Sequence, residues 1–347
     1  MYEIYTSHEL YGVMYDRRLE APTTYFLDLL FPGSFMSTRE DIYFEKIGSS
    51  RRVAPFVLPT VPGRPIFRRD GSEVRNFRPA YLKPKDRVNP GDQIKRQPGD
   101  LFTATPRTPL QNWDAEVARI VQLHRTSIQR RWEWMASQAA LNGSVVVAGE
   151  GYPSVTVDFG RAAGHTITKG AGTYWTTTYD ILEDIQSWMD LMQRADFGGV
   201  PNRITVGTAV WSIMRKNTAL LNEMDLTRRG NPELNIQTGL TTPAPVRYVG
   251  TLGAGLEVYV YNDTFQNDAG AQVPFMDQRD ILLTSPGVEG IKAFGAIIDA
   301  EAGLAAMDIF PKMWPEKDPS GMFIMSQSAP LMIPVNPNCT LRARVLA

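Results

Sequence analysis

Asp180, Glu183 and Asp184 form the one close group of side chains in this sequence that could perform acid–base chemistry or bind Mg²⁺. The three acids lie in the first turn of a helix predicted over about Asp180–Ala195, where carboxylates complement the helix dipole. We favour this structural interpretation. An enzyme with a metal site built only from carboxylates stays open as an alternative, and it would need these acids to face a pocket.

The other residue types that commonly carry chemistry are few and scattered. His8, His124, His165 and the single cysteine, Cys339, lie far apart and match no zinc or disulfide pattern. The sequence has no GxxxxGK[ST] phosphate loop, strand-linked GxGxxG or GxSxG elbow, and Gly250–Gly255 is interpreted as a turn between two strands. We therefore expect no catalytic residue, no cofactor and no metal ion, and a protein that is not an enzyme.

The charge of the chain is small in total and uneven in distribution. The 347 residues carry 36 Lys and Arg against 37 Asp and Glu, so whole-surface binding to nucleic acid or to an anionic membrane is disfavoured. Residues 51–110 hold 13 basic against 5 acidic side chains, a local charge of +8, and the remaining residues carry −9. No apolar run approaches the roughly 18–20 residues of a membrane helix, and the N-terminus has no secretory signal.

The basic segment also contains ten of the 25 prolines, which exclude a helix through most of its length. Residues 65–77 predict two strands joined at an Asp70–Gly71 turn. Ordering about 60 residues costs roughly 60–120 kcal/mol, and an isolated hairpin cannot bury the ~2,400 Å² of apolar surface needed to offset even the lower value. The segment is therefore either a flexible basic linker or a loop ordered on other surfaces, such as neighbouring chains; its aliphatic and aromatic content favours the second.

Several regular elements must position these residues. A short amphipathic segment over Tyr25–Phe31 ends at Pro32–Gly33, and a helix over Leu110–Asn142 begins at Thr108–Pro109 and ends at Gly143. Its apolar stripe consists of Leu110, Trp113, Val117, Ile120, His124, Ile128, Trp132, Met135 and Ala139. We interpret His124 as a core residue. Arg125, Arg130 and Arg131 lie mostly off the stripe, either in solvent or against a neighbour or nucleic acid.

Strands are predicted over most of the remaining chain. The predicted strand segments are 145–148, 155–159, 203–206, 246–249, 256–261, 280–283, 330–335 and 342–346, with a short helix at 209–215. Helices and strands are thus both expected, in an α+β arrangement.

An ordered set of motifs resembles one known family. Gly63–Ser72 (GRPIFRRDGS) followed by Phe77–Pro90 (FRPAYLKPKDRVNP) resembles the basic extended loop of the lambda-type major capsid proteins of tailed bacteriophages, the major capsid protein E family. Further similar segments follow in order, at Val157–Arg161, Gly172–Trp175, Leu226–Gly230 and Gln327–Met332.

The resemblance implies the Hong Kong 97 type phage capsid fold, with the following division of the chain. Residues 1–50 would be an N-terminal arm, 51–107 the extended loop, 108–199 a peripheral domain with spine helix 110–142, 200–325 an axial domain, and 326–347 a C-terminal strand returning to the peripheral domain. The implied inter-subunit contact residues in the loop are Arg64, Arg68, Arg69, Phe77, Arg78, Tyr81, Lys83, Lys85 and Arg87. In the axial domain they are Arg228 and Arg229.

The function implied is a structural one. Copies of the chain would self-assemble into the pentamers and hexamers of an icosahedral head around double-stranded DNA, bound nonspecifically. Capsid decoration (cement) protein, scaffold and portal proteins would be partners, no membrane would be involved, and the protein would pass from the host cytoplasm into the virion. Some members of this fold crosslink a loop lysine to a neighbour's asparagine; Lys83, Lys85 and Lys95 are available, but lambda-type relatives rely on cement proteins, so no crosslink is assigned. The alternative is a basic-armed DNA-binding protein.

Overall fold

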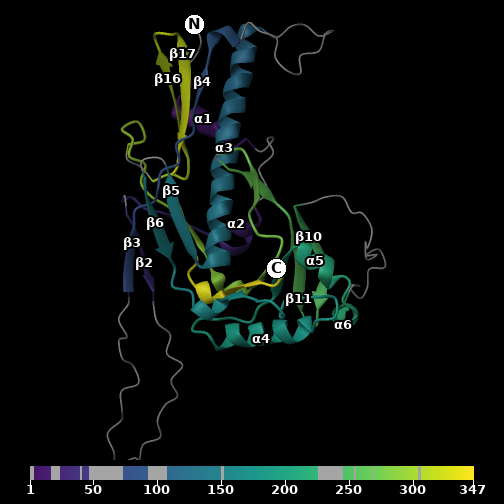
Figure 1. Ribbon diagram of the computed structural model, residues 1–347. Helices are drawn as coiled ribbons and strands as arrows, with labels where there is room; N and C mark the ends of the chain where they lie inside the picture. Colours follow the sequence, from purple (N-terminus) through teal and green to yellow (C-terminus); the bar gives the residue numbers. More distant parts are fainter. Residues whose placement is uncertain are drawn as a thin grey trace, which may run out of the picture.

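One long helix, α3, runs through most of the molecule, and other elements pack along it (Figure 1). The computed structural model describes residues 4–16, 24–39, 41–46, 73–92, 108–149, 152–225, 245–253, 255–267, 269–303 and 306–347. Helix α3 spans Pro109–Asn142, as predicted. At its start Thr108 and Gln111 form a capping box, and at its end Gly143 adopts a left-handed conformation with φ 67°.

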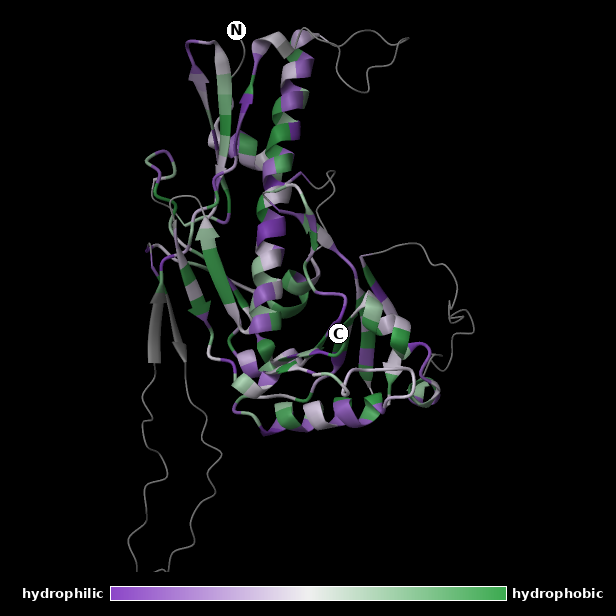
Figure 2. Ribbon diagram, viewed as in Figure 1, coloured by the Kyte–Doolittle hydropathy of each residue, from purple (hydrophilic) through white to green (hydrophobic). Residues whose placement is uncertain are grey.

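The apolar stripe of α3 is buried, except at its first position. Trp113, Val117, Ile128 and Trp132 are core residues, and hydrophobic and hydrophilic residues alternate along the helix (Figure 2). The prediction for Leu110 was wrong, because this side chain is 51% exposed.

Short N-terminal elements lie against α3. Helices α1 (Ser7–Met14) and α2 (Tyr25–Leu30) both contact it, and α2 confirms the predicted amphipathic segment. Strand β1 (Gly33–Met36) then pairs in parallel with β15 (Ile291–Phe294), which is antiparallel to β18 (Pro330–Ile333). Leu10, Met14, Phe26 and Leu27 enter the same core as the stripe of α3.

Beside the N-terminal half of α3, near α1, lies a three-stranded sheet, which we call the tip sheet. It has the order β16 (Phe310–Glu316), β17 (Gly321–Gln327), β4 (Lys85–Val88), all antiparallel (Figure 1). No prediction covered β16 or β17. Pro311 and Pro315 obscure β16 in the sequence, and both are tolerated because β16 is an edge strand.

The largest sheet has seven strands in the order β7-β19-β14-β8-β11-β10-β9. Their bounds are β7 Thr166–Thr168, β19 Thr340–Arg344, β14 Asp280–Thr284, β8 Arg203–Gly207, β11 Leu256–Tyr261, β10 Val246–Leu252 and β9 Met224–Asp225. The pairs β7/β19 and β8/β11 are parallel, and the other pairs are antiparallel.

The two faces of this sheet belong to two different cores. Ile281 and Leu283 of β14 pack with α4 (Ile181–Arg194), α5 (Thr208–Met214) and α6 (Thr218–Glu223). The residue between them, Leu282, belongs to the core around α3. Because side chains alternate along a strand, the sheet is a wall shared by both cores.

Three two-stranded ladders complete the described fold. Strands β5 (Ser144–Gly149) and β6 (Tyr152–Asp158) cover two of the predicted strand segments and pair antiparallel, and β12 (Thr264–Gln266) pairs with β13 (Gln272–Pro274). Short 3-10 turns occur at Pro90–Asp92, Ala163–His165, Pro286–Val288 and Pro337–Cys339.

The third ladder is a pairing that no prediction covered. Strand β3 (Glu73–Phe77) pairs antiparallel with β2 (Ile42–Lys46), from Ile42↔Phe77 to Lys46↔Glu73. The predicted hairpin over residues 65–77 has its first strand and its Asp70–Gly71 turn outside the described part of the chain, so it stays a prediction. The partner that the structure describes for β3 comes from earlier in the chain, a long-range pairing that turn residues do not encode.

The sheets also cross the expected domain divisions. Residues 166–194 and 340–345 pack on the seven-stranded sheet together with residues 203–283. Phe294, Met313 and Ile324, from the segment 200–325 expected as axial, lie in the core around α3. No helix in the described residues is long and apolar enough to cross a membrane.

Candidate functional site

Residues 77–88, which the sequence places in the expected extended loop, contact the rest of the described chain through several side chains. Phe77 is partly buried against the core around α3. The hydroxyl of Tyr81 donates to Ala296 O at 2.6 Å and accepts from Ile298 N at 3.0 Å. Leu82 pairs its backbone with Ser328 in both directions. Packing and hydrogen bonds therefore hold residues 77–82 against the rest of the described chain.

Strand β4 continues this path with cations on aromatic rings. Lys83 Nζ lies 4.9 Å from the ring centroid of Tyr81, and Lys85 Nζ lies 3.8 Å from that of Phe323. Arg87 donates to Pro319 O at 2.6 Å and lies 3.6 Å from Glu316. Each of these sequence-predicted contact residues thus makes contacts within its own chain.

The remaining predicted contact residues divide into two groups. Arg78 is exposed next to Phe77. Arg64, Arg68, Arg69, Arg228 and Arg229 lie outside the described residues, as does Lys95. The described part of the loop set therefore runs from Phe77 at the end of β3 to Lys85 and Arg87 in the tip sheet.

His124 joins this loop strand to the spine helix. Its ring is 2% exposed, with Nε2 2.9 Å from Asp86 Oδ2 and Nδ1 3.1 Å from Ser326 Oγ. Because a carboxylate only accepts, Nε2 carries the proton and the Ser326 hydroxyl donates to Nδ1. Burial lowers the pKa of His124, and Asp86 opposes that shift. This confirms the interpretation of His124 as a core residue.

The N-terminal arm is held by a residue that sequence reasoning missed. The Glu133 carboxylate accepts from the backbone N–H groups of Tyr25, Phe26 and Leu27, at 3.1, 2.8 and 2.9 Å. The Tyr261 hydroxyl donates to it at 3.4 Å. Burial raises the pKa of Glu133 to about 7, although the backbone hydrogen bonds oppose that shift. The sequence signal that could have identified Glu133 is an acidic residue between two tryptophans, Trp132 and Trp134, in a helix with a buried face.

Two of the three arginines left open on α3 also hold other segments. Arg125 donates to Met14 O at 2.7 Å and lies over the ring of Tyr15, so it secures the end of α1. Arg130 donates to Thr264 O at 3.0 Å. Arg131 lies over the ring of Trp134, on its own helix.

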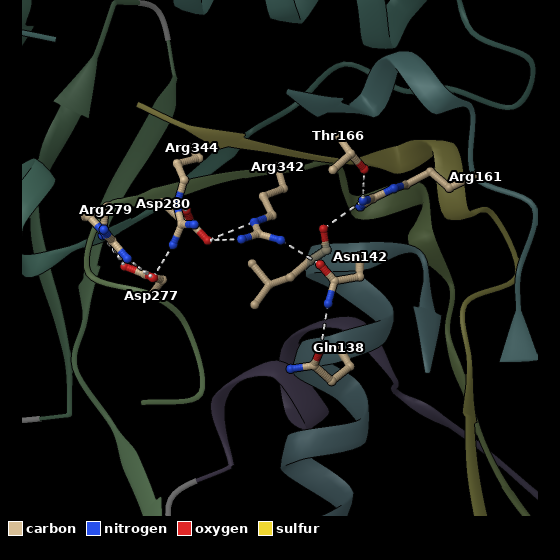
Figure 3. A network of polar contacts seen from close by, with 10 residues as sticks. Gln138, Asn142, Arg161, Thr166, Asp277, Arg279, Asp280, Arg342 and Arg344 are labelled. Carbon is tan, nitrogen blue, oxygen red and sulfur yellow. Dashed lines mark hydrogen bonds and ion pairs between the residues drawn. The ribbon is translucent and has the colours of Figure 1, made fainter. Parts of the chain in front are cut away.

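A polar network joins the C-terminal end of α3 to the seven-stranded sheet (Figure 3). Arg342 donates to Asp280 Oδ2 at 2.8 Å and to Asn142 Oδ1 at 2.6 Å. Arg344 pairs with Asp277 and lies 3.3 Å from Asp280. A hydrogen bond from Arg279 lowers the pKa of Asp277 to about 2. Basic residues at alternate positions of an apolar strand were the sequence signal for this junction.

Arg161, from one of the family-like motifs, caps the same helix end. Its guanidinium donates to Ala140 O and Leu141 O, each at 2.7 Å, and to Thr166 Oγ1 at 2.6 Å (Figure 3). Burial lowers the pKa of Arg161 to about 10. The cap ties α3 to the start of β7.

The carboxylate group near residue 180 has structural partners. Asp180 Oδ1 accepts from Glu183 N at 3.1 Å and caps α4. Asp184 pairs with Lys169 and accepts from Trp175 Nε1 at 2.6 Å. Within the described part of the chain, no three His, Cys, Asp or Glu side chains are arranged to hold a metal ion. Cys339 is buried and donates to Phe197 O at 3.1 Å.

These contacts attach the N-terminal segment and strand β4 to the long helix α3. Comparison with known proteins shows which family the chain belongs to. The sequence profile described as "Phage major capsid protein E" matches residues 15–345. The chain belongs to the phage major capsid protein E family.

Individual relatives agree with this assignment. The major capsid protein of Escherichia phage lambda is 31% identical over 328 residues, covering 90% of this chain and 91% of that protein. The major capsid protein of Escherichia phage N15 is 30% identical over 352 residues, covering 96% and 97%. A crystal structure of the putative capsid protein of an E. coli CFT073 prophage superposes with a TM-score of 0.73 at 21% identity, over 99% and 100% of the two chains.

Membership of the capsid protein E family decides the broad function. The chain is a structural major capsid protein with the α+β Hong Kong 97 type fold, it is located in the virion head, and it is not an enzyme. The resemblance drawn from the loop and the later motifs is confirmed. The anchors described above are therefore features of a shell subunit.

Proposed function

We propose that copies of this chain assemble into pentamers and hexamers that build an icosahedral head around double-stranded DNA. The observation that carries the proposal is the β2–β3 ladder, which places Lys46 and Glu73, the residues on either side of segment 47–72, next to each other. A basic segment anchored at both ends beside the body is suited to reach a neighbouring subunit while its own body stays fixed. Family membership supports the same conclusion.

Negative-stain electron microscopy of the purified protein tests the proposal. We expect rings of five or six subunits, or closed shells, whose abundance increases with protein concentration. Compact monomers at every concentration would overturn it. Since a hexamer is a ring of heterologous contacts, rings rather than symmetric dimers are the decisive outcome.

The DNA inside the head would be contained rather than tightly bound. The net charge of the chain is −1, so a purified subunit presents no strong excess of cations to phosphates. We expect filter-binding assays with duplex DNA to give weak, sequence-independent retention at physiological salt. Tight retention would favour the alternative of a basic-armed DNA-binding protein.

We extend the proposal to the other components expected around such a head. A decoration protein, a scaffold protein and a portal would contact the shell during assembly or afterwards. Co-expression of this chain with the other head proteins of its phage, followed by mass spectrometry of the purified shells, tests each of these partners. A denaturing gel of the same shells tests the assignment of no crosslink, because covalent multimers would appear as a ladder.

A further inference from the structure

The tip sheet has one face packed on α3 and one face turned away from it. Met313, Ile324 and Val88 are 7%, 0% and 2% exposed and face the core. Side chains alternate along each strand, and the register aligns the three strands. The residues next to these core-facing positions in each strand therefore share the opposite face. We call this opposite surface the tip face; its residues are Lys85, Arg87, Lys312, Trp314, Phe323 and Met325.

The register arranges the tip face in two rows across the strands. One row is Trp314–Phe323–Arg87, and the other is Lys312–Met325–Lys85. The rings of Trp314 and Phe323 are 5.7 Å apart, and Lys85 Nζ lies 3.8 Å from the centroid of Phe323 and 5.3 Å from that of Trp314. Lys312 Nζ lies 5.4 Å from the ring centroid of Trp314. Cations and rings therefore hold one another in place.

Four of the six tip-face residues belong to types enriched in protein–protein interfaces, and the two lysines belong to a depleted type. Aromatic residues, methionine and arginine are enriched in interfaces, and Trp and Arg are frequent anchors there. The side chains are already ordered by their mutual contacts and by the hydrogen bond from Arg87 to Pro319 O at 2.6 Å. Less conformational entropy is then lost on association.

We propose that the tip face docks an acidic surface of a second copy of this chain; the inference rests on the proposed assembly function. Around the three cations of the tip face, Asp299 lies 2.5 Å from Lys312 and Glu316 lies 3.6 Å from Arg87, so a positive charge is left over near Lys85. Outside residues 51–110 the chain carries a net charge of −9. A neighbouring body is thus a partner of complementary charge.

Nucleic acid fits the tip face less well. Bases stack on open ring faces, whereas the rings of Phe323 and Trp314 already carry Lys85. Binding to duplex DNA depends on the number of phosphates that cations neutralise, and two of the three cations here already have a carboxylate partner. DNA binding is therefore the competing outcome of the test.

Two substitutions and a matched control test the proposal. Lys85→Glu reverses the charge beside the two rings of the tip face, and Trp314→Ala removes its largest ring. Lys216→Glu makes the same charge change at an exposed position after α5, far along the chain from the tip sheet and beside the seven-stranded sheet. Circular dichroism and thermal melts establish that each variant folds, and sedimentation velocity gives the concentration at which half the protein is assembled.

We expect Lys85→Glu and Trp314→Ala each to raise this concentration about tenfold or more, with Lys85→Arg close to wild type and Lys216→Glu within about twofold. If the wild-type protein assembles and both tip-face variants match it, the proposal is wrong and the assembly function stands. If the wild-type protein does not associate, both fail. Loss of duplex DNA retention by Lys85→Glu with unchanged assembly would assign the tip face to DNA instead.

Discussion

Two buried titratable residues on α3 hold the segments that leave the body. Glu133 accepts three backbone hydrogen bonds from the arm, and His124 lies between Asp86 of β4 and Ser326 of β17. A buried polar group without its partners costs roughly 1–3 kcal/mol, so displacing either segment is unfavourable unless water replaces the partners. Single residues thus decide how firmly the arm and the loop strand are attached.

The first prediction concerns Glu133→Gln. Because the pKa of Glu133 is raised to about 7 from 4.5, its protonated form is the one the folded state favours. The stability that this group contributes is complete below pH 4.5 and is lost as the pH rises through about 7, by on the order of 3 kcal/mol. Glutamine does not titrate, so the variant should gain stability relative to wild type between pH 5 and pH 8.

Urea unfolding at pH 5 and pH 8 measures this difference, with exposed Glu183→Gln as the control. The prediction concerns only the change with pH, since glutamine also alters the hydrogen bonds to the arm at every pH. Parallel pH dependence of wild type and Glu133→Gln would contradict it.

Tyr81→Phe gives the second prediction at this scale. The substitution removes a hydroxyl that donates to Ala296 O and accepts from Ile298 N, and it keeps the ring. We expect a loss of about 1–3 kcal/mol in the free energy of unfolding, because both backbone groups lose a partner. Urea titration monitored by tryptophan fluorescence checks this value, and an unchanged midpoint would show that water replaces the hydroxyl.

At the scale of elements, α3 is the rigid member to which the others attach. Its start is closed by the Thr108–Gln111 capping box and its end by Gly143 and Arg161. At 1.5 Å per residue its 34 residues span roughly 50 Å, long enough to connect the tip sheet with the seven-stranded sheet. The ends of this helix determine how those two sheets are placed.

The third prediction tests the C-terminal end of α3. In Gly143→Ala the new Cβ would lie 2.7 Å from Arg161 Cβ at a φ of 67°, so both backbone strain and crowding of the cap are expected. The left-handed conformation alone costs about 1–2 kcal/mol, and displacement of Arg161 adds to it. Thermal unfolding should give a clear decrease in Tm.

Two other glycines separate these effects. Gly172 has a φ of 88° with nothing near its Cβ position, and Gly149 has neither a positive φ nor a close neighbour. Gly172→Ala should show the conformational cost alone, and Gly149→Ala should be near neutral. An order of effects other than Gly143, Gly172, Gly149 would refute the role of the Arg161 cap.

At the scale of the whole molecule, charge is divided between a basic loop of +8 and a remainder of −9. Charge complementarity between subunits guides association and register more than it adds affinity. Salt screens exposed charges over about 8–10 Å near physiological ionic strength. We therefore expect assembly to weaken as the salt concentration rises.

The fourth prediction is that Arg68→Glu with Arg69→Glu lowers the yield of shells and reduces the dependence of that yield on salt. The double change replaces two positive side chains with two negative ones and so lowers the net charge of the loop by four units. Its attraction to a neighbour of opposite charge should weaken. Electron microscopy and light scattering across a salt series measure both quantities. If yield and salt dependence match the wild type, electrostatic guidance by the loop is wrong.

The sequence by itself determined the features that depend on neighbours within a turn or two of the chain. Thr108–Pro109 and Gly143 located the limits of α3, Asp180 located the start of α4, and the ordered motifs identified the family. Only the tertiary structure decided that β3 pairs with β2, that β19 lies between β7 and β14, and that Glu133 holds an arm 107 residues away. Caps and turns are local interactions, whereas strand partners and the burial of a lone carboxylate depend on segments that only the folded chain brings together.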